Sequence, residues 1–123
     1  MSTLLIYTDE THMELANHHI SPCRMYFACE DELLGIEYFQ SVSPNDEMAR
    51  SCQTLAKVLA LPGYDFQTIH LHYHKRAYNE FPYFKLLIRE KHPTLHVRLF
   101  RIRPLNKAGT WIVSSNFICS GYL

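Results

Sequence analysis

Asp9 stands at a position where a carboxylate could do chemistry. It ends an apolar run, Leu4–Thr8, and a second carboxylate, Glu47, follows 38 residues later near the start of an expected helix. A carboxylate at the tip of a buried strand is costly to desolvate unless it has a partner or binds a metal ion. Asp9 is therefore a candidate functional residue. The alternative is that Thr8 and Asp9 only close the strand as turn and cap residues.

A second group of candidate ligands consists of three alternating histidines, His70, His72 and His74. Alternate side chains of a strand project from the same face, so these imidazoles are expected to share one face of a sheet. Imidazoles arranged in this way can bind Zn²⁺ or Mn²⁺. The alternative is that they only cover a half-exposed face of the sheet, and the lack of a second ligand motif nearby in the sequence favours it.

Basic residues in the second half of the chain are candidate contacts to the phosphates of RNA or DNA. They are Lys75, Arg76, Arg98, Arg101, Arg103 and Lys107. Aromatic residues between them, such as Tyr73 and Tyr78, could stack on bases. Against this, Lys and Arg on edge strands are an ordinary protection against aggregation, and a net charge of zero argues against tight non-specific binding to nucleic acid.

The zero net charge conceals a division of the chain into two halves. Residues 1–65 carry ten acidic and three basic residues, and residues 66–123 carry two acidic and nine basic residues. This asymmetry predicts a dipolar surface, which could also favour head-to-tail association of copies of the chain into a homo-oligomer. The two halves could equally be neighbours that neutralise one another.

The composition predicts one globular domain over residues 1–123. A hydrophobic content of 47% with 15 Phe or Tyr residues can form a core, which argues against a disordered chain. We expect no membrane-spanning segment, because no apolar run is long enough. We expect a cytoplasmic protein, because no signal peptide is recognisable and the cysteines form no CxxC pair.

Hydrophobic periodicity and turn residues predict the element order β-β-β-α-β-α-β-β. The expected strands are residues 4–8, 24–30, 33–40, 66–73, 95–102 and 110–118. One expected helix begins after Ser43, and the other covers residues 80–91. Pro44 suits the first helical position, and an apolar stripe follows it at Met48, Cys52, Leu55 and Leu59.

Strands 2 and 3 are expected to form an antiparallel hairpin, with Leu34, Ile36 and Tyr38 on one face and Glu37 on the other. Two right-handed crossovers would then place strands 4 and 5 beside strand 1. The sequence therefore predicts a mixed sheet of α/β (α+β) class, with strand order 3-2-1-4-5 and flanking helices.

The chain resembles the ribonuclease H family over most of residues 3–105. The resemblance rests on an apolar first strand ending in Thr-Asp at Leu5–Asp9, and on Glu47–Ala49, which is similar to the family's metal-binding glutamate motif. Residues 84–87 and 97–102 are similar to its later helix and fifth strand. The resemblance implies a ribonuclease H-like fold, with Asp9 and Glu47 as catalytic residues that bind a divalent metal, Mg²⁺ or Mn²⁺ rather than Zn²⁺.

In the ribonuclease H arrangement the tip of strand 4 lies next to Asp9. The resemblance thus implies a mixed site of Asp9 and Glu47 with His72 and His74. The family's third carboxylate, at the end of strand 4, is replaced by the histidines of this chain, and Glu10 stands where the family has glycine. Two functions are therefore expected: metal-dependent cleavage or binding of nucleic acid, or a non-enzymatic module that binds a protein partner on the same scaffold.

Overall fold

The computed structural model describes residues 2–9, 24–38, 44–73, 80–101 and 112–120. The strands are β1 (Ser2–Asp9), β2 (Arg24–Cys29), β3 (Glu32–Tyr38), β4 (Phe66–Tyr73), β5 (His96–Arg101) and β6 (Ile112–Ser120). The helices are α2 (Pro44–Leu59) and α3 (Glu80–Lys91). This order confirms the predicted one. Every strand except β4 differs from its predicted bounds by one or two residues at one end or both, as strand ends commonly do.

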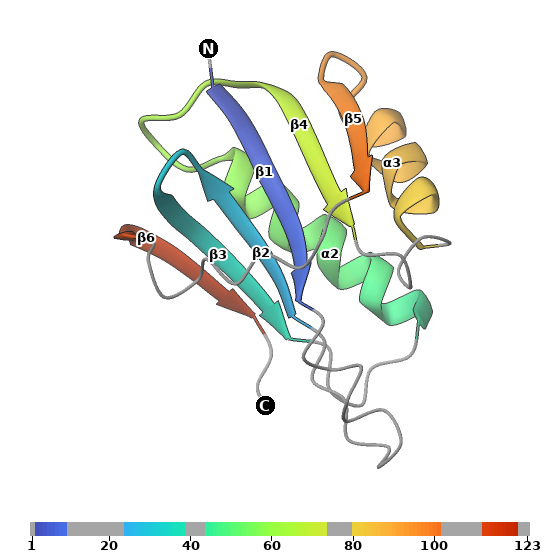
Figure 1. Ribbon diagram of the computed structural model, residues 1–123, viewed down its shortest axis with the longest axis horizontal. Helices are drawn as coiled ribbons and strands as arrows, with labels where there is room; N and C mark the ends of the chain where they lie inside the picture. The colour runs from blue at the N-terminus through green and yellow to red at the C-terminus, as the bar shows by residue number, and fades with distance from the viewer. Residues whose placement is uncertain (1, 10–23, 39–43, 74–79, 102–111, 121–123) are drawn as a thin grey trace.

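The strands form one mixed sheet in the order β5-β4-β1-β2-β3-β6 (Figure 1). β1 pairs with β4, and β4 with β5, in parallel. β2 pairs antiparallel with β1 and with β3, whereas β6 returns parallel to β3 at the far edge. The predicted order 3-2-1-4-5 with an interior first strand is confirmed, and the sixth strand extends the sheet beside β3.

Both helices pack on the same face of the sheet. Leu4 and Ile6 of β1, fully buried, belong to one core cluster with Leu55 of α2 and Phe84 of α3. Residues of β1 alternate between faces, so Tyr7 instead packs on the other side in a smaller cluster with Tyr26 and Leu33. Each face of the central strands is therefore apolar, as expected for strands in the middle of a mixed sheet.

Helix α2 forms where capping and periodicity predict it. It begins at Pro44, whose fixed φ suits the first helical turn. Met48, Cys52 and Leu55 of the predicted stripe are buried, at 8%, 8% and 1% exposure. Gly63, with a φ of 88°, follows in the connection to β4 and takes a backbone conformation that other residues rarely adopt.

No helix in the described ranges is long and apolar enough to cross a membrane.

The predicted alternation in β3 is wrong at Leu34. Leu34 packs in the helix-side core, whereas Ile36 packs on the opposite face. The cause is a bulge, because the pairing shifts between Phe27 with Gly35 and Ala28 with Leu33, which leaves Leu34 as an extra residue. Glu37 therefore lies on the helix side with Leu34 and is fully buried there.

Candidate functional site

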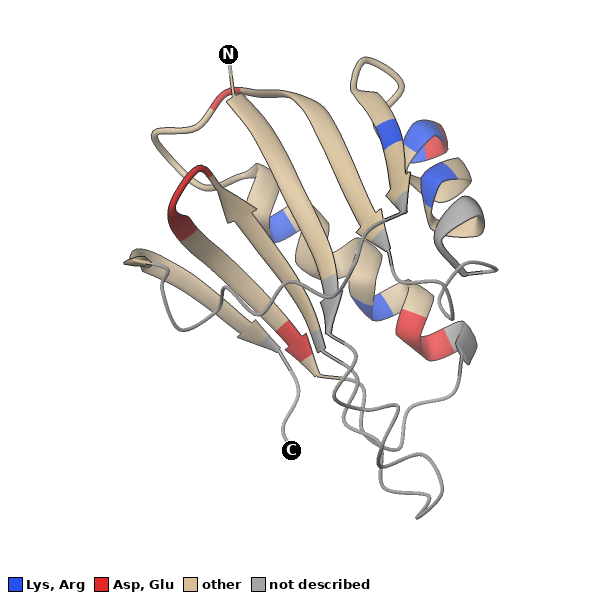
Figure 2. Ribbon diagram, in the orientation of Figure 1, with Lys and Arg blue, Asp and Glu red and all other residues tan. Residues whose placement is uncertain are grey.

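The predicted site lies at the carboxyl edge of the parallel strands. β1, β4 and β5 run in the same direction, so their carboxyl ends meet at one edge of the sheet, where open α/β sheets commonly bind ligands. Figure 1 shows that α2 begins at this end of the molecule, and its first turn carries Asp46 and Glu47 (Figure 2). The end of β1 and the acidic first turn of α2 therefore lie at the same end of the molecule.

Asp9 is the last residue of β1 and is paired with Arg24 of β2. Two positions earlier in β1, Tyr7 is paired with His72 of β4. The expected neighbour relation between strand 1 and strand 4 is therefore confirmed. Whether an imidazole reaches the Asp9 carboxylate stays a prediction, since the structure describes only the backbone at Asp9.

His72 is held between two aromatic rings. Its ring is stacked on Tyr7, with 4.6 Å between centroids and 24° between planes, and on Phe100 of β5, with 5.1 Å and 15°. Both imidazole nitrogens are buried and have no hydrogen-bond partner within the part of the chain that the structure describes. Burial, with a smaller effect from His70, lowers the pKa of His72 to about 4. The imidazole is therefore neutral near pH 7, which is the form that binds metals.

His70 and Arg98 extend this face toward the edge strand β5. His70 lies edge-on to His72 with 6.2 Å between ring centroids, so the predicted common face is confirmed for these two histidines. The pKa of His70 is lowered by burial and by the charge of Arg98, its partner in the β4–β5 register. Arg98 is exposed, and its guanidinium carbon lies 5.3 Å from the centroid of Phe100, a cation–π distance.

Glu47 lies half-buried in the first turn of α2. Its backbone carbonyl accepts a hydrogen bond from the Ser51 hydroxyl, at 2.8 Å. A carboxylate in the first turn is also favoured by the helix dipole, so Asp46 and Glu47 stabilise the helix whether or not they bind a ligand. A metal-binding role for Glu47 therefore needs its own test.

Several predicted site residues fall outside the described part of the chain. They are His74, Lys75, Arg76, Arg103 and Lys107, and for Arg101 the structure gives the backbone alone. Among the residues that the structure does describe, no group of three or more His, Cys, Asp or Glu side chains is placed to hold a metal ion. The complete ligand set of the predicted site stays a prediction.

The described charges are divided across the sheet. Basic residues lie on α3 and β5 toward one edge of the sheet, and acidic residues lie on β3 and the turn before it toward the other edge, with Asp65 and Glu90 as acidic residues on the basic side (Figure 2). α2 carries both signs, with Asp46 and Glu47 in its first turn and Lys57 in its last. The choice between a dipolar surface and mutual neutralisation stays a prediction, because Glu37 of β3 is fully buried against Arg50 and does not contribute to the surface.

One polar cluster was missed by sequence reasoning. Glu37 of β3 is fully buried beneath α2, where Arg50 lies 2.7 Å from its Oε1 atom and the Thr54 hydroxyl donates to Oε2 at 2.5 Å. The available signal was the spacing of Arg50 and Thr54, which are one helical turn apart on a face that also carries the buried Ser51. The bulge at Leu34 concealed this signal, because the bulge places Glu37 on the same side of the sheet as Leu34 instead of on the opposite side.

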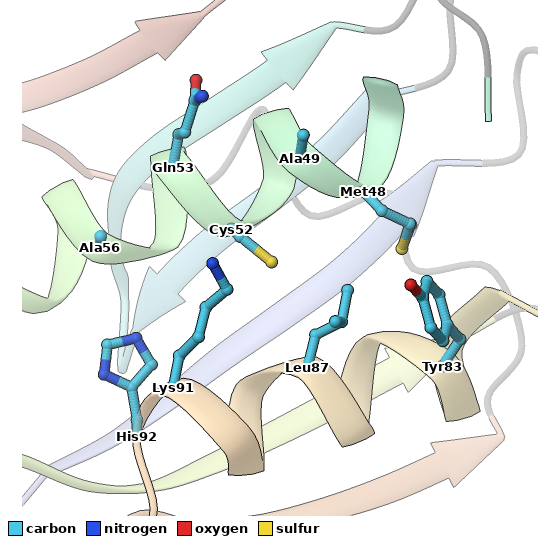
Figure 3. Close-up of a pocket in the computed structure, with 9 residues that line it drawn as sticks. All are labelled: Met48, Ala49, Cys52, Gln53, Ala56, Tyr83, Leu87, Lys91 and His92. Carbon is cyan, nitrogen blue, oxygen red and sulfur yellow. The ribbon is translucent and has the colours of Figure 1, made fainter. Parts of the chain in front are cut away.

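A groove of about 570 Å³ runs between the two helices (Figure 3). Its walls are mainly apolar, with Met48 and Cys52 on α2 and Leu87 on α3, and Lys91 reaches across one end toward Cys52 (Figure 3). Burial raises the pKa of Cys52, although the charge of Lys91 acts in the opposite direction. The groove lies on the helix side of the sheet, whereas His72 lies on the other side.

Comparisons with known proteins identify the fold. No protein-family model matches the sequence, and the search of curated proteins gave no match. Among solved structures, the chain is similar to the human cytomegalovirus terminase nuclease domain soaked with manganese and bound to an inhibitor. The TM-score is 0.59 at 15% identity, over 95% of this chain and 65% of that domain. For a manganese-soaked structure of the same domain, the TM-score is 0.58 at 14% identity, over 95% of this chain and 64% of that domain.

The protein therefore has a ribonuclease H-like fold, as the resemblance in its sequence implied. The chain spans a little under two thirds of the length of the viral nuclease domains that it matches. At this level of identity the similarity defines the arrangement of strands and helices, and the chemistry must be argued from the residues themselves.

Proposed function

We propose that the protein is a nuclease that cleaves phosphodiester bonds with a divalent metal ion held at the carboxyl edge of the sheet. The observation that supports this most directly is the placement of Asp9 at the end of an interior strand, beside β4 and at the end of the molecule where the acidic first turn of α2 lies. The solved nuclease domains with the same fold were soaked with manganese, which agrees with such an ion.

The residues at this edge suit a divalent ion by their donor chemistry. Asp9 and Glu47 would supply the hard carboxylate oxygens that Mg²⁺ and Mn²⁺ prefer. His72, on the face of the sheet away from α2, is neutral, and neither of its ring nitrogens has a hydrogen-bond partner among the described residues. Its imidazole would suit Mn²⁺ or Zn²⁺, with His74 as the next candidate along the chain. When bound, the metal would lower the pKa of a water molecule and offset charge on a phosphate.

The remaining candidate residues would hold the nucleic acid. Arg98 is exposed on the face that carries His70 and His72, and a guanidinium there can contact a phosphate. Lys75, Arg76, Arg101, Arg103 and Lys107 would add further phosphate contacts by their charge. The substrate class we propose is an RNA–DNA hybrid or a single strand, and binding that depends on these contacts should weaken steeply with salt.

The test is a cleavage assay on labelled RNA–DNA hybrid and single strands with Mn²⁺, run beside calorimetric titration of the ion. Wild type should bind Mn²⁺ and cleave, and Asp9→Asn should abolish cleavage because it keeps the shape of the side chain and removes its charge. Glu47→Gln should do the same. Asp46→Asn, on the same helical turn, is the matched control and should leave cleavage near the wild-type rate.

The proposal is overturned if wild type neither binds Mn²⁺ nor cleaves, and Asp9→Asn changes only the stability of the fold. Asp9 would then be a residue that closes β1. Equal loss of cleavage in Asp46→Asn and Glu47→Gln would point to a general effect on the helix start, because neutralising either residue weakens its interaction with the helix dipole.

A further inference from the structure

The buried polar cluster under α2 joins the helix to the sheet by directional contacts. Glu37 contributes both carboxylate oxygens, one to Arg50 at 2.7 Å and one to Thr54 at 2.5 Å. The contact with Arg50 is a charge pair rather than an aligned hydrogen bond. Glu37 is fully buried and Thr54 is 1% exposed, so the cluster is removed from solvent except at Arg50. It ties the middle of α2 to β3.

This cluster is not needed to bury the helix. The apolar stripe of α2 already does so, and replacing a buried ion pair by apolar residues of similar volume is often neutral or stabilising. Removing one partner is costly, because a charge is then left buried and unpaired. What this cluster adds is direction, since the Thr54 hydroxyl must meet the Glu37 carboxylate at one distance and angle, and Arg50 must stay near that carboxylate to offset the cost of its burial. It therefore fixes the rotation and the axial position of the helix.

The contacts lie close along the helix to the candidate metal ligand Glu47. Arg50 follows Glu47 by three residues, and Ser51, also fully buried, follows by four and donates its hydroxyl to the Glu47 carbonyl. A slip of the helix by one residue would move Glu47 by about 1.5 Å and turn it by about 100°. Such a displacement would remove a carboxylate from the coordination distance of a metal ion.

We propose that Glu37, Arg50 and Thr54 are positioning residues that hold the first turns of α2 in register with β3 and so place the Glu47 carboxylate at the carboxyl edge of the sheet. This inference rests on the proposed function, because it assigns the cluster to the same metal site. The cluster itself does not contact the metal. Its effect on metal binding passes through the position of the helix.

The test replaces the whole cluster by apolar residues of similar size, in the triple variant Glu37→Leu, Arg50→Met, Thr54→Val. The triple variant should be more stable to urea than the single variant Arg50→Met, which leaves the fully buried Glu37 carboxylate without its charge partner. Its affinity for Mn²⁺, measured by calorimetry, should fall about 10-fold or more, which is typical of groups that orient a metal ligand. Hydrogen exchange in the second and third turns of α2, where the amides have partners within the helix, should become faster in the metal-free protein.

The matched control is the double variant Gln53→Leu, Lys57→Met on the exposed face of the same helix. It should leave the Mn²⁺ affinity and the exchange rates within about twofold of wild type, because surface substitutions away from such contacts have small effects. If the triple variant does not fold, Thr54→Val removes one hydrogen bond and keeps the shape. Faster exchange in the second and third turns of α2 and weaker Mn²⁺ binding are then expected from that variant.

Two outcomes separate this inference from the proposed function. A folded variant, triple or Thr54→Val, that binds Mn²⁺ as wild type does, with unchanged exchange in α2, overturns the positioning role and leaves the nuclease proposal intact. A wild-type protein that binds no Mn²⁺ contradicts the nuclease proposal. In that case the exchange rates alone still decide whether the cluster holds the start of the helix.

Discussion

The ring of Tyr7 on β1 and the imidazole of His72 on β4 are stacked across two parallel strands, 4.6 Å apart at their centroids. Tyr7 lies two positions before Asp9, so the stack lies close to the carboxyl edge where the metal site is proposed. The pKa of the Tyr7 hydroxyl is raised by burial, which keeps that ring uncharged beside a neutral imidazole. The pair therefore forms an uncharged surface next to an acidic edge.

The first prediction concerns the protonation of His72. Its pKa is about 4 in the folded protein against 6.5 as a reference, chiefly because burial disfavours the charged form. The contribution of this neutral imidazole to stability is full above about pH 6.5 and is lost as the pH falls through 4, because the unfolded chain takes up the proton first. NMR titration of the histidine ring protons should show one histidine titrating near 4. Phe100→Ala should raise that value by exposing the ring.

The control for this prediction is Tyr83→Ala, which alters an aromatic ring of α3 that is 52% exposed. It should leave the titration of His72 where it was. If His72 titrates near 6.5 in the wild-type protein, its imidazole is solvated. That result would contradict the proposal that His72 stays neutral below pH 6.5 and can bind a metal ion there.

The second prediction concerns the contact between Tyr64 and Glu32. The Tyr64 hydroxyl donates to the Glu32 carboxylate, and its ring is stacked on Phe66 with 5.3 Å between centroids. Burial, followed by the hydrogen bond and the charge of Glu32, raises the pKa of Tyr64 to about 12. Because the folded pKa lies above the reference value of 10.0, the stability from this group is present below pH 10 and is lost as the pH rises through 12.

Spectroscopic titration of tyrosinate should therefore show one late-ionising group that is missing in Tyr64→Phe. Glu32→Gln should move that group toward the reference value, since it removes the charge that opposes ionisation. An unchanged late group in Tyr64→Phe would assign the late ionisation to another tyrosine.

The third prediction concerns Gly35, where α2 and β6 approach β3 closely. A Cβ atom at this position would lie 3.0 Å from the backbone oxygen of Ile118 and 3.4 Å from Cγ2 of Val58. The nearer obstacle is backbone and cannot rotate away, so Gly35→Ala should cost about 1–3 kcal/mol of unfolding free energy. Urea unfolding measures this. Adding Val58→Ala should not restore the stability.

Gly63→Ala is the informative comparison for Gly35→Ala. A Cβ at Gly63 would meet nothing within 4 Å, so any cost there comes from its φ of 88° alone. Recovery of stability by Val58→Ala in the Gly35→Ala background would instead show that the helix, and not β6, sets the close approach.

The sequence alone determined the elements and most of the sheet. Local periodicity distinguishes a strand such as β4, with its alternating histidines, from a helix such as α2, with an apolar residue every three or four positions. The order of the first five strands followed because right-handed crossovers leave few arrangements for such a series of elements. Asp9 and Glu47 were candidates from their positions at the ends of elements, and their chemistry stays a prediction.

Tertiary structure decided what depends on contacts between distant residues. The place of β6 beside β3 is set by which edge of the sheet is open and how apolar faces meet, and its own residues do not specify a partner. The burial of Glu37 required a bulge at Leu34 and an arginine thirteen positions later in the chain. From the sequence alone, a carboxylate such as Glu37 is predicted to lie on the surface. The free energy of burying it depends on a partner that only the folded chain brings within 3 Å.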